Sequence, residues 1–144
     1  MIDTKARIEA FAGAHSFLSN FYPSDLEYGG EVYPTVEHAF QAAKTFDLAE
    51  RRRIRDLTNP AQAKRAGRRV ALRDDWERVK VGIMEALLRQ KFADPTLRAE
   101  LRETAGRDLV EGNTWGDRFW GVYNGRGQNH LGRLLMKIRA ELDE

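Results

Sequence analysis

The stretch YPTVEHAFQAAK, residues 33–44, has the features of a helix that begins directly after a proline. Thr35 can cap its first turn, because a threonine hydroxyl accepts a hydrogen bond from a backbone N–H two or three residues later. Apolar side chains follow at helical spacing, at Val36, Ala39, Phe40 and Ala43. The pattern predicts a helix from Thr35 to about Phe46.

The polar side chains of this helix form a narrow stripe at the edge of its apolar face. With about 100° between successive residues, Gln41 lies about 40° and Lys44 about 20° from Glu37 around the axis. A carboxylate beside apolar surface can act as a general acid or base, and a lysine there can lose its proton and attack a sugar aldehyde. By spacing alone, a surface ladder of weakly paired side chains is the favoured interpretation. His38 lies on the other flank and is the residue least expected to act in catalysis.

The composition is typical of one globular domain, which we expect to cover residues 1–144. Hydrophobic residues make up 42% of the chain and charged residues 32%. No apolar run approaches the roughly 20 residues of a membrane helix, and the first residues lack the apolar core of a signal peptide. There is no cysteine, which excludes disulfides, a thiol nucleophile and thiolate metal sites. We expect a cytoplasmic protein with no membrane partner.

Several other kinds of site find no support in the sequence. The histidines His15, His38 and His130 are isolated, and the acidic pair at residues 74–75 resembles a helix cap, so we expect no metal. The glycine-rich stretch NGRGQN lacks the lysine and serine that end a P-loop. A serine hydrolase would need a glycine-flanked nucleophile, and none is present.

The pattern along the rest of the chain predicts a mostly helical α+β domain with a small antiparallel sheet. Residues 1–34 have the features of strands and turns, with Gly29-Gly30 as the turn of a hairpin. A further short strand is predicted at residues 108–111. Further helices are predicted at residues 48–57, 60–67, 75–92, 96–104 and from about 129 to 142.

A glycine-rich loop at residues 112–129 is the second candidate site. It contains Asp117, Trp120 and Asn129 among several glycines. Loops of this length without secondary structure are usually functional, and glycines allow backbone N–H groups to approach a ligand, often a phosphate. The alternative is a loop packed by its own aromatic side chains.

Two more segments carry candidate binding groups. Asn20 and Phe21, within SFLSNFYP, could offer an amide and a stacking face to a flat heterocycle, although a hydrophobic turn is the simpler interpretation. The segment 51–69 carries eight basic residues and one acid, Asp56. Arginine suits phosphate, but a solvated helical face is the more common reason for such a run.

Seven stretches, in this order, resemble the NADAR family, the YbiA-like N-glycosidases. Single stretches would be weak signals, whereas seven in order over residues 17–142 are specific. They are FLSNFYP, YPTVEHAFQAAK, NPAQAKRAGR, WERVKVGIMEALLRQKF, LRETAGRDLVE, DRFWG and GQNHLGRLLMKIR. The chain departs from the family pattern at Trp115, Gly116 and residues 122–126, in the loop that we expect to help choose the leaving base.

The resemblance implies cleavage of N-glycosidic bonds without a metal or redox cofactor. It implies a catalytic carboxylate at Glu37 and pocket residues at Lys44, Trp76, Asp117 and Trp120, with a Schiff base between Lys44 and the opened sugar left open. Together with the candidates above, the predicted catalytic residues are Glu37, Lys44, Asp117 and Trp120. The predicted substrate-binding residues are Asn20, Phe21, Gln41, Arg68, Trp76 and Asn129, with Arg68 on phosphate.

The leading expectation for the substrate is an anionic N-riboside, a phosphorylated ribosylaminopyrimidine of the riboflavin pathway. An alternative substrate is ADP-ribose attached to guanine in nucleic acid or nucleotides, which the basic segment 51–69 would suit. A second alternative is a non-catalytic module that binds nucleotides or nucleic acid. A pure binder has no need of a carboxylate beside an anion site, and the Glu37–Lys44 stripe therefore favours the enzyme.

Overall fold

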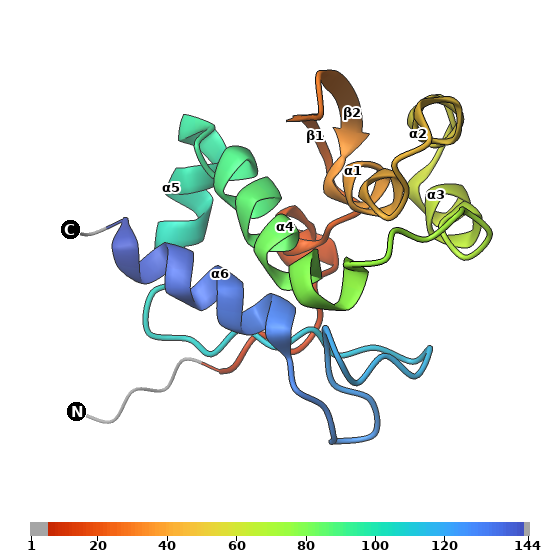
Figure 1. Ribbon diagram of the computed structural model, residues 1–144. Coiled ribbons are helices and arrows are strands. Elements are labelled where there is room, and N and C mark those ends of the chain that lie inside the picture. Colours follow the sequence, from red (N-terminus) through yellow and green to blue (C-terminus); the bar gives the residue numbers. More distant parts are fainter. Residues whose placement is uncertain (1–5, 143–144) are drawn as a thin grey trace, which may run out of the picture. The chain divides into compact units, whose positions relative to one another are not determined.

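The computed structural model describes residues 6–142, and its chain divides into two units (Figure 1). The central unit comprises residues 20–91, and the terminal unit joins residues 6–19 to residues 92–142. The central unit contains the helix and the binding segments predicted from residues 20–76, and the terminal unit contains the glycine-rich loop.

The central unit begins with the predicted hairpin. Strands β1 (Pro23–Tyr28) and β2 (Glu31–Thr35) are antiparallel, and Leu26 pairs with Tyr33. Both of these side chains are fully buried. The glycine pair 29–30 has positive φ at both positions, a conformation that glycine adopts without strain. The hairpin was therefore predicted correctly.

Four helices follow in the central unit, and three of them begin at a residue whose side chain caps the first turn, as predicted for Thr35. They are α1 (Val36–Ala43), α2 (Leu48–Arg55), α3 (Pro60–Ala66) and α4 (Trp76–Lys91). The side chains of Thr35, Asp47 and Asn59 each accept a hydrogen bond from a backbone N–H three residues later, at the starts of α1, α2 and α3. These bonds satisfy N–H groups that have no partner within the helix.

Helix α1 ends at Ala43, whereas the sequence predicted an end near Phe46. The backbone carbonyl of Lys44 accepts a hydrogen bond of 2.7 Å from the N–H of Arg73. A continuing helix would use that carbonyl for its own N–H four residues later. The helix therefore ends earlier than predicted where Arg73, 29 residues further along the chain, binds the carbonyl of Lys44.

Helix α1 is the buried centre of its unit. All eight of its residues are buried, including Glu37, His38 and Gln41. It packs against β1, β2, α2, α3 and α4, which surround it in Figure 1. The interpretation of its polar stripe as a solvated surface ladder is therefore wrong.

The terminal unit contains the 3-10 helix η1 (Gly13–Leu18) and the helices α5 (Pro95–Glu103) and α6 (His130–Glu141). η1 and α5 pack together. The sequence predicted only strands and turns at the N-terminal end, and η1 was missed. The strands expected near Ile8 and at residues 108–111 are reduced to one parallel bridge between Ile8 and Leu109.

The glycine-rich loop of the terminal unit is closed by contacts with its own unit. A Cβ atom at Gly112 would overlap the carbonyl oxygen of Glu9, and one at Gly121 would overlap that of Glu111. Gly127 lies in the same way against the carbonyl of Gly121. These three glycines permit backbone to approach backbone, which is a different use from the ligand contact that the sequence suggested.

None of the helices within residues 6–142 combines the length and the apolar character needed to cross a membrane. The cytoplasmic location stays a prediction.

Candidate active site

Glu37 and Gln41 form a buried pair on successive turns of α1. Their residues are 7% and 5% exposed, and Gln41 Nε2 donates a hydrogen bond of 3.0 Å to Glu37 Oε1. The spacing of four residues brings the side chains to the same face of the helix. The carboxyl group is therefore held in one direction within a site from which water is largely excluded.

Asn20 precedes β1 in the chain and contacts the first turn of α1. Its backbone carbonyl accepts a hydrogen bond of 3.0 Å from the N–H of Glu37. Its side-chain Nδ2 faces Met84 Sδ at 3.7 Å, whereas no donor from residues 6–142 reaches its buried Oδ1. The neighbouring Phe21 is 41% exposed. An acceptor and an aromatic face thus lie side by side in the sequence, as a flat heterocycle with amino groups requires.

Lys44 is the C-cap residue of α1 and is half-buried. Burial lowers the pKa of its ammonium group, and the carboxylate of Glu37 acts in the opposite direction. The cations Arg68, Lys80 and Lys64 lower this pKa further. The surroundings therefore raise the share of the neutral amine, the nucleophilic form of lysine, above that of an exposed lysine.

Arg68 and Trp76 also belong to the central unit, in different environments. Arg68 is exposed in the turn after α3. Trp76 is only 5% exposed, and its ring centroid lies 5.0 Å from that of Phe40. The observed contact of Trp76 is thus with the apolar face of α1, and stacking on a substrate base stays a prediction.

His38 is buried and hydrogen-bonded within the protein, which fits the expectation that it does not act in catalysis. It is 1% exposed, and its ring nitrogens lie 2.7 Å from Thr35 Oγ1 and 3.1 Å from the carbonyl oxygen of Leu57. Burial lowers the pKa of the imidazole, and the hydrogen bond to Leu57 acts in the opposite direction. The ring ties the start of α1 to the segment after α2.

The other three predicted residues lie in the terminal unit. Asp117 Oδ1 accepts hydrogen bonds from the N–H groups of Phe119 and Trp120, at 3.0 and 2.9 Å. The ring of Trp120 meets that of Phe119 edge-on, with centroids 4.9 Å apart. The Asn129 amide accepts from Glu111 N–H and donates to Leu109 C=O. These contacts shape the loop, and the roles of Asp117, Trp120 and Asn129 toward a substrate stay predictions.

The comparisons with known proteins address the whole chain. A family model described as the NADAR domain matches residues 9–143. The chain belongs to the NADAR family. The seven-stretch resemblance and the expected fold class are thereby confirmed.

Relatives with curated names support the enzyme class. The chain is 40% identical to N-glycosidase YbiA of Shigella boydii, over 99% of this chain and 91% of the relative. It is 37% identical to a riboflavin biosynthesis protein of Vibrio vulnificus, over 90% of this chain and 36% of that longer protein. The NMR structure of YbiA from E. coli superimposes with a TM-score of 0.81 at 40% identity, covering 95% of this chain and 85% of the other. This NADAR protein is an N-glycosidase, a hydrolase that acts on N-glycosyl compounds.

Sequence reasoning missed two cations of the NADAR site. Lys64 on α3 and Lys80 on α4 lie near enough to Lys44 for their charges to lower its pKa. Both lie within stretches that resemble the family, but no spacing along the sequence relates them to Lys44, because the three lysines belong to three different helices. Only the packing of α3 and α4 against α1 brings them together.

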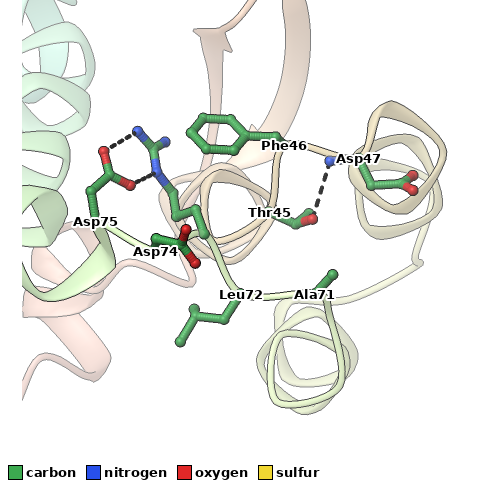
Figure 2. Close-up of a pocket in the computed structure, with 8 residues that line it drawn as sticks. Thr45, Phe46, Asp47, Ala71, Leu72, Asp74 and Asp75 are labelled. Atoms are coloured by element: carbon green, nitrogen blue, oxygen red, sulfur yellow. Dashed lines mark hydrogen bonds and ion pairs between the residues drawn. The ribbon is translucent and has the colours of Figure 1, made fainter.

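A separate hollow of about 340 Å³ lies beside the end of α1 (Figure 2). None of the predicted site residues lines it. Its lining includes Phe46, Leu72 and Arg73, and the guanidinium of Arg73 lies 4.2 Å from the ring centroid of Phe46 and pairs with Asp75. Within residues 6–142, no three His, Asp or Glu side chains gather in the way a metal ion needs.

Proposed function

We propose that this NADAR protein hydrolyses the ribose–nitrogen bond of phosphorylated ribosylaminopyrimidines, releasing ribose 5-phosphate and the free base. The observation that carries the proposal is the buried Glu37 carboxyl group, held by Gln41 on the same helix as Lys44. The riboflavin biosynthesis protein among the relatives supports this substrate class.

Glu37 suits the charge that develops during this reaction. As the bond from the sugar carbon to nitrogen breaks, its electron pair leaves with nitrogen and positive charge builds on the sugar. A fixed carboxylate in a water-poor site stabilises that charge, because it needs no reorientation during the reaction. Glu37 then takes a proton from the attacking water, the water oxygen bonds to the sugar carbon, and the proton passes to the departing nitrogen.

Lys44 has two roles open to it. As an ammonium group it binds a sugar oxygen that carries negative charge. As a neutral amine, whose share rises because burial lowers the pKa of Lys44, it attacks the aldehyde carbon of the opened sugar. The aldehyde oxygen leaves as water when the carbon–nitrogen double bond of the Schiff base forms.

The remaining groups of the central unit suit the two ends of such a substrate. The buried Asn20 Oδ1 accepts no hydrogen bond from residues 6–142 and would suit a donor such as a base amino group, and Phe21 offers a ring for stacking. Arg68, with Lys64 and Lys80 near Lys44, would attract the phosphate. Gln41 and Trp76 complete the predicted residues of this unit.

The test measures ribose 5-phosphate release from ribosylaminopyrimidine phosphates by the wild type and by Glu37→Gln. Loss of the carboxylate should lower kcat by about 10²- to 10⁴-fold. Glu103→Gln is the matched control, because Glu103 is exposed in α5, and it should keep the wild-type rate. Full activity of Glu37→Gln would show that this carboxylate is not catalytic.

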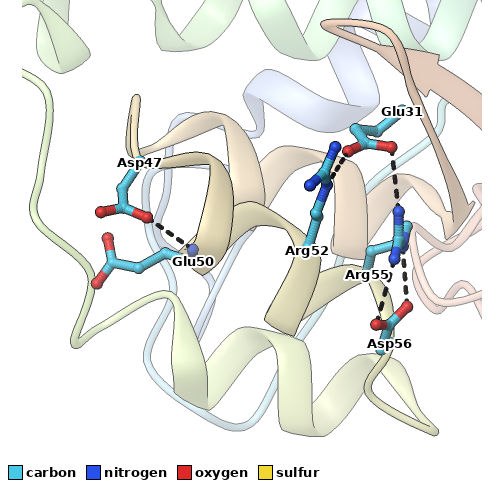
Figure 3. Close-up of polar contacts among 6 residues, drawn as sticks. All are labelled: Glu31, Asp47, Glu50, Arg52, Arg55 and Asp56. Carbon is cyan, nitrogen blue, oxygen red and sulfur yellow. Dashed lines mark hydrogen bonds and ion pairs between the residues drawn. The ribbon is translucent and has the colours of Figure 1, made fainter.

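The rival substrate, ADP-ribosyl-guanine in nucleic acid, depends on the basic segment 51–69. Part of that charge is already neutralised within the protein (Figure 3). Arg52 and Arg55 both bind the carboxylate of Glu31, and Arg55 also binds Asp56. Activity on ADP-ribosylated DNA with none on the pyrimidine phosphates would favour the rival. Salt-sensitive binding of nucleic acid with no turnover of any N-riboside would favour a binding module.

A further inference from the structure

Gly67 is buried at the end of α3 and lies directly against the side chain of Gln41. A Cβ atom at position 67 would overlap Gln41 Oε1 and would lie 2.7 Å from its Cδ and 3.1 Å from its Cβ. The φ of Gly67 is −61°, which every residue type can adopt. The position therefore requires the absence of a side chain, and not the backbone freedom of glycine.

The Gln41 amide lies with its nitrogen toward Glu37 and its oxygen toward Gly67. Its Nε2 donates to Glu37 Oε1, and its Oε1 is buried with no hydrogen-bond donor from residues 6–142. The opposite orientation would place the amide oxygen against the oxygen of Glu37. A buried acceptor without a donor costs free energy. The hydrogen bond to Glu37 offsets that cost, and the absence of a side chain at Gly67 leaves space for the amide oxygen.

We propose that Gly67 is a positioning residue that acts on Glu37 through Gln41. Because glycine has no side chain, the Gln41 amide fits beside position 67 and reaches the carboxylate of Glu37. This inference rests on the proposed function, in which Glu37 is the catalytic carboxylate. It assigns to α3 a part in catalysis that does not require contact with the substrate.

The consequence for catalysis follows from the packing around position 67. A methyl group there displaces the Gln41 side chain, because the new carbon would overlap its Oε1 and would lie 2.7 Å from its Cδ in a buried environment. Glu37 then loses the hydrogen bond that Gln41 Nε2 donates to its Oε1. A displacement of about 1 Å in a catalytic group can lower a rate about 100-fold.

The experiment is a double-mutant cycle with Gly67→Ala, Gln41→Ala and the double variant. We expect Gly67→Ala to lower kcat about 10- to 100-fold while KM changes less than about threefold. Gln41 acts here on Glu37, whereas Asn20, Phe21 and Arg68, the groups proposed to bind base and phosphate, are unchanged. In the Gln41→Ala background there is no amide to displace. Gly67→Ala should then lower kcat no further, since mutations that act through one shared partner are not additive.

Stability separates positioning from a structural role. Removing the overlapping amide should restore the melting temperature of Gly67→Ala in the double variant, but it should not restore kcat. Gly82→Ala is the matched control: Gly82 is in α4, and a Cβ there meets no atom within 4 Å. Its kcat should equal that of the wild type. Wild-type kcat in Gly67→Ala, or losses that multiply in the double variant, would overturn the proposal.

A readout that does not need turnover keeps the two proposals distinct. The side-chain NH₂ resonances of Gln41 should shift in Gly67→Ala and stay in place in Gly82→Ala. If the wild type hydrolysed no ribosylaminopyrimidine phosphate, the proposed function would fail, and these resonances would still report on the contact. If the wild type were active and the Gln41 resonances did not move in Gly67→Ala, the positioning role would fail alone.

Discussion

The hydroxyl of Thr35 donates a hydrogen bond to Nδ1 of His38, with a heavy-atom distance of 2.7 Å. The direction follows from the other ring nitrogen, because Nε2 faces the carbonyl oxygen of Leu57 at 3.1 Å and a carbonyl can only accept. The same hydroxyl accepts from the backbone N–H of His38 at 3.0 Å. A neutral imidazole thus joins the cap of α1 to the chain after α2.

Replacing His38 should damage stability and leave catalysis intact. His38→Ala removes two buried hydrogen bonds and opens a cavity, which should lower the free energy of unfolding by about 2–4 kcal/mol. The kcat of the folded fraction should stay within about threefold of the wild type, because the ring nitrogens face Thr35 Oγ1 and the carbonyl oxygen of Leu57. Urea unfolding and turnover under native conditions measure the two effects, with His15→Ala as the control. A 100-fold loss of kcat would contradict this assignment.

The stability of the protein should also fall in mild acid because of His38. Burial lowers its pKa in the folded state, so below the ordinary value of about 6.5 the unfolded chain binds a proton that the folded chain does not. The contribution is therefore complete above about pH 6.5 and is lost as the pH falls toward the folded-state pKa. The loss of melting temperature between pH 7.5 and 5.5 should be smaller in His38→Ala than in the wild type. An equal loss would exclude His38 as its source.

Catalysis should require that the Lys44 ammonium group can lose a proton. Lys44→Arg keeps the positive charge but removes the nucleophilic amine, so kcat should fall by about 100-fold or more. Treatment of the substrate-loaded wild type with borohydride should give a covalent adduct on Lys44 that mass spectrometry detects. Lys137→Arg, on the exposed side of α6, should keep both activity and adduct. An active wild type without any adduct would exclude the Schiff base.

Arg68 should contribute to binding of the phosphate and not to the bond cleavage. We expect Arg68→Gln to raise KM for the phosphorylated substrate about 10-fold, the scale of one charge-assisted hydrogen bond. The KM for the dephosphorylated nucleoside should not change. Arg53→Gln is the matched control, because Arg53 is also exposed and lies on α2. Equal effects of the two variants would point to a general effect of net charge.

The Glu31 carboxylate should weaken the binding of the basic segment 51–69 to polyanions. The hydrogen bond from Arg52 lowers the pKa of this carboxyl group, and Arg55 binds its other oxygen. Glu31→Gln should leave turnover unchanged and remove the carboxylate partner of Arg52, while Arg55 keeps its pairing with Asp56. The protein should then elute from heparin at higher salt. Arg52→Gln in the same background should reverse the shift. Elution at the wild-type salt concentration would show that these arginines do not bind polyanions.

Local features of this protein were predictable from neighbouring residues. The glycine pair 29–30 and the caps at Thr35, Asp47 and Asn59 each depend on one turn of backbone and one side chain, and these interactions hardly depend on the rest of the chain. The stripe of Glu37 and Gln41 was predictable for the same reason, since residues four apart meet on any α-helix. The end of α1 was not, because Arg73 takes the carbonyl of Lys44.

By itself, the sequence determined the family, the hairpin and the order of the α-helices, and the presence of Glu37, Gln41 and Lys44 on one helix. Only the tertiary structure decided that this helix is buried on every side, that Lys64 and Lys80 approach Lys44, and that Gly67 makes room for Gln41. The physical reason is one of range. Caps and helical spacing act over a few residues, whereas burial, charge and steric overlap depend on segments that only folding brings together.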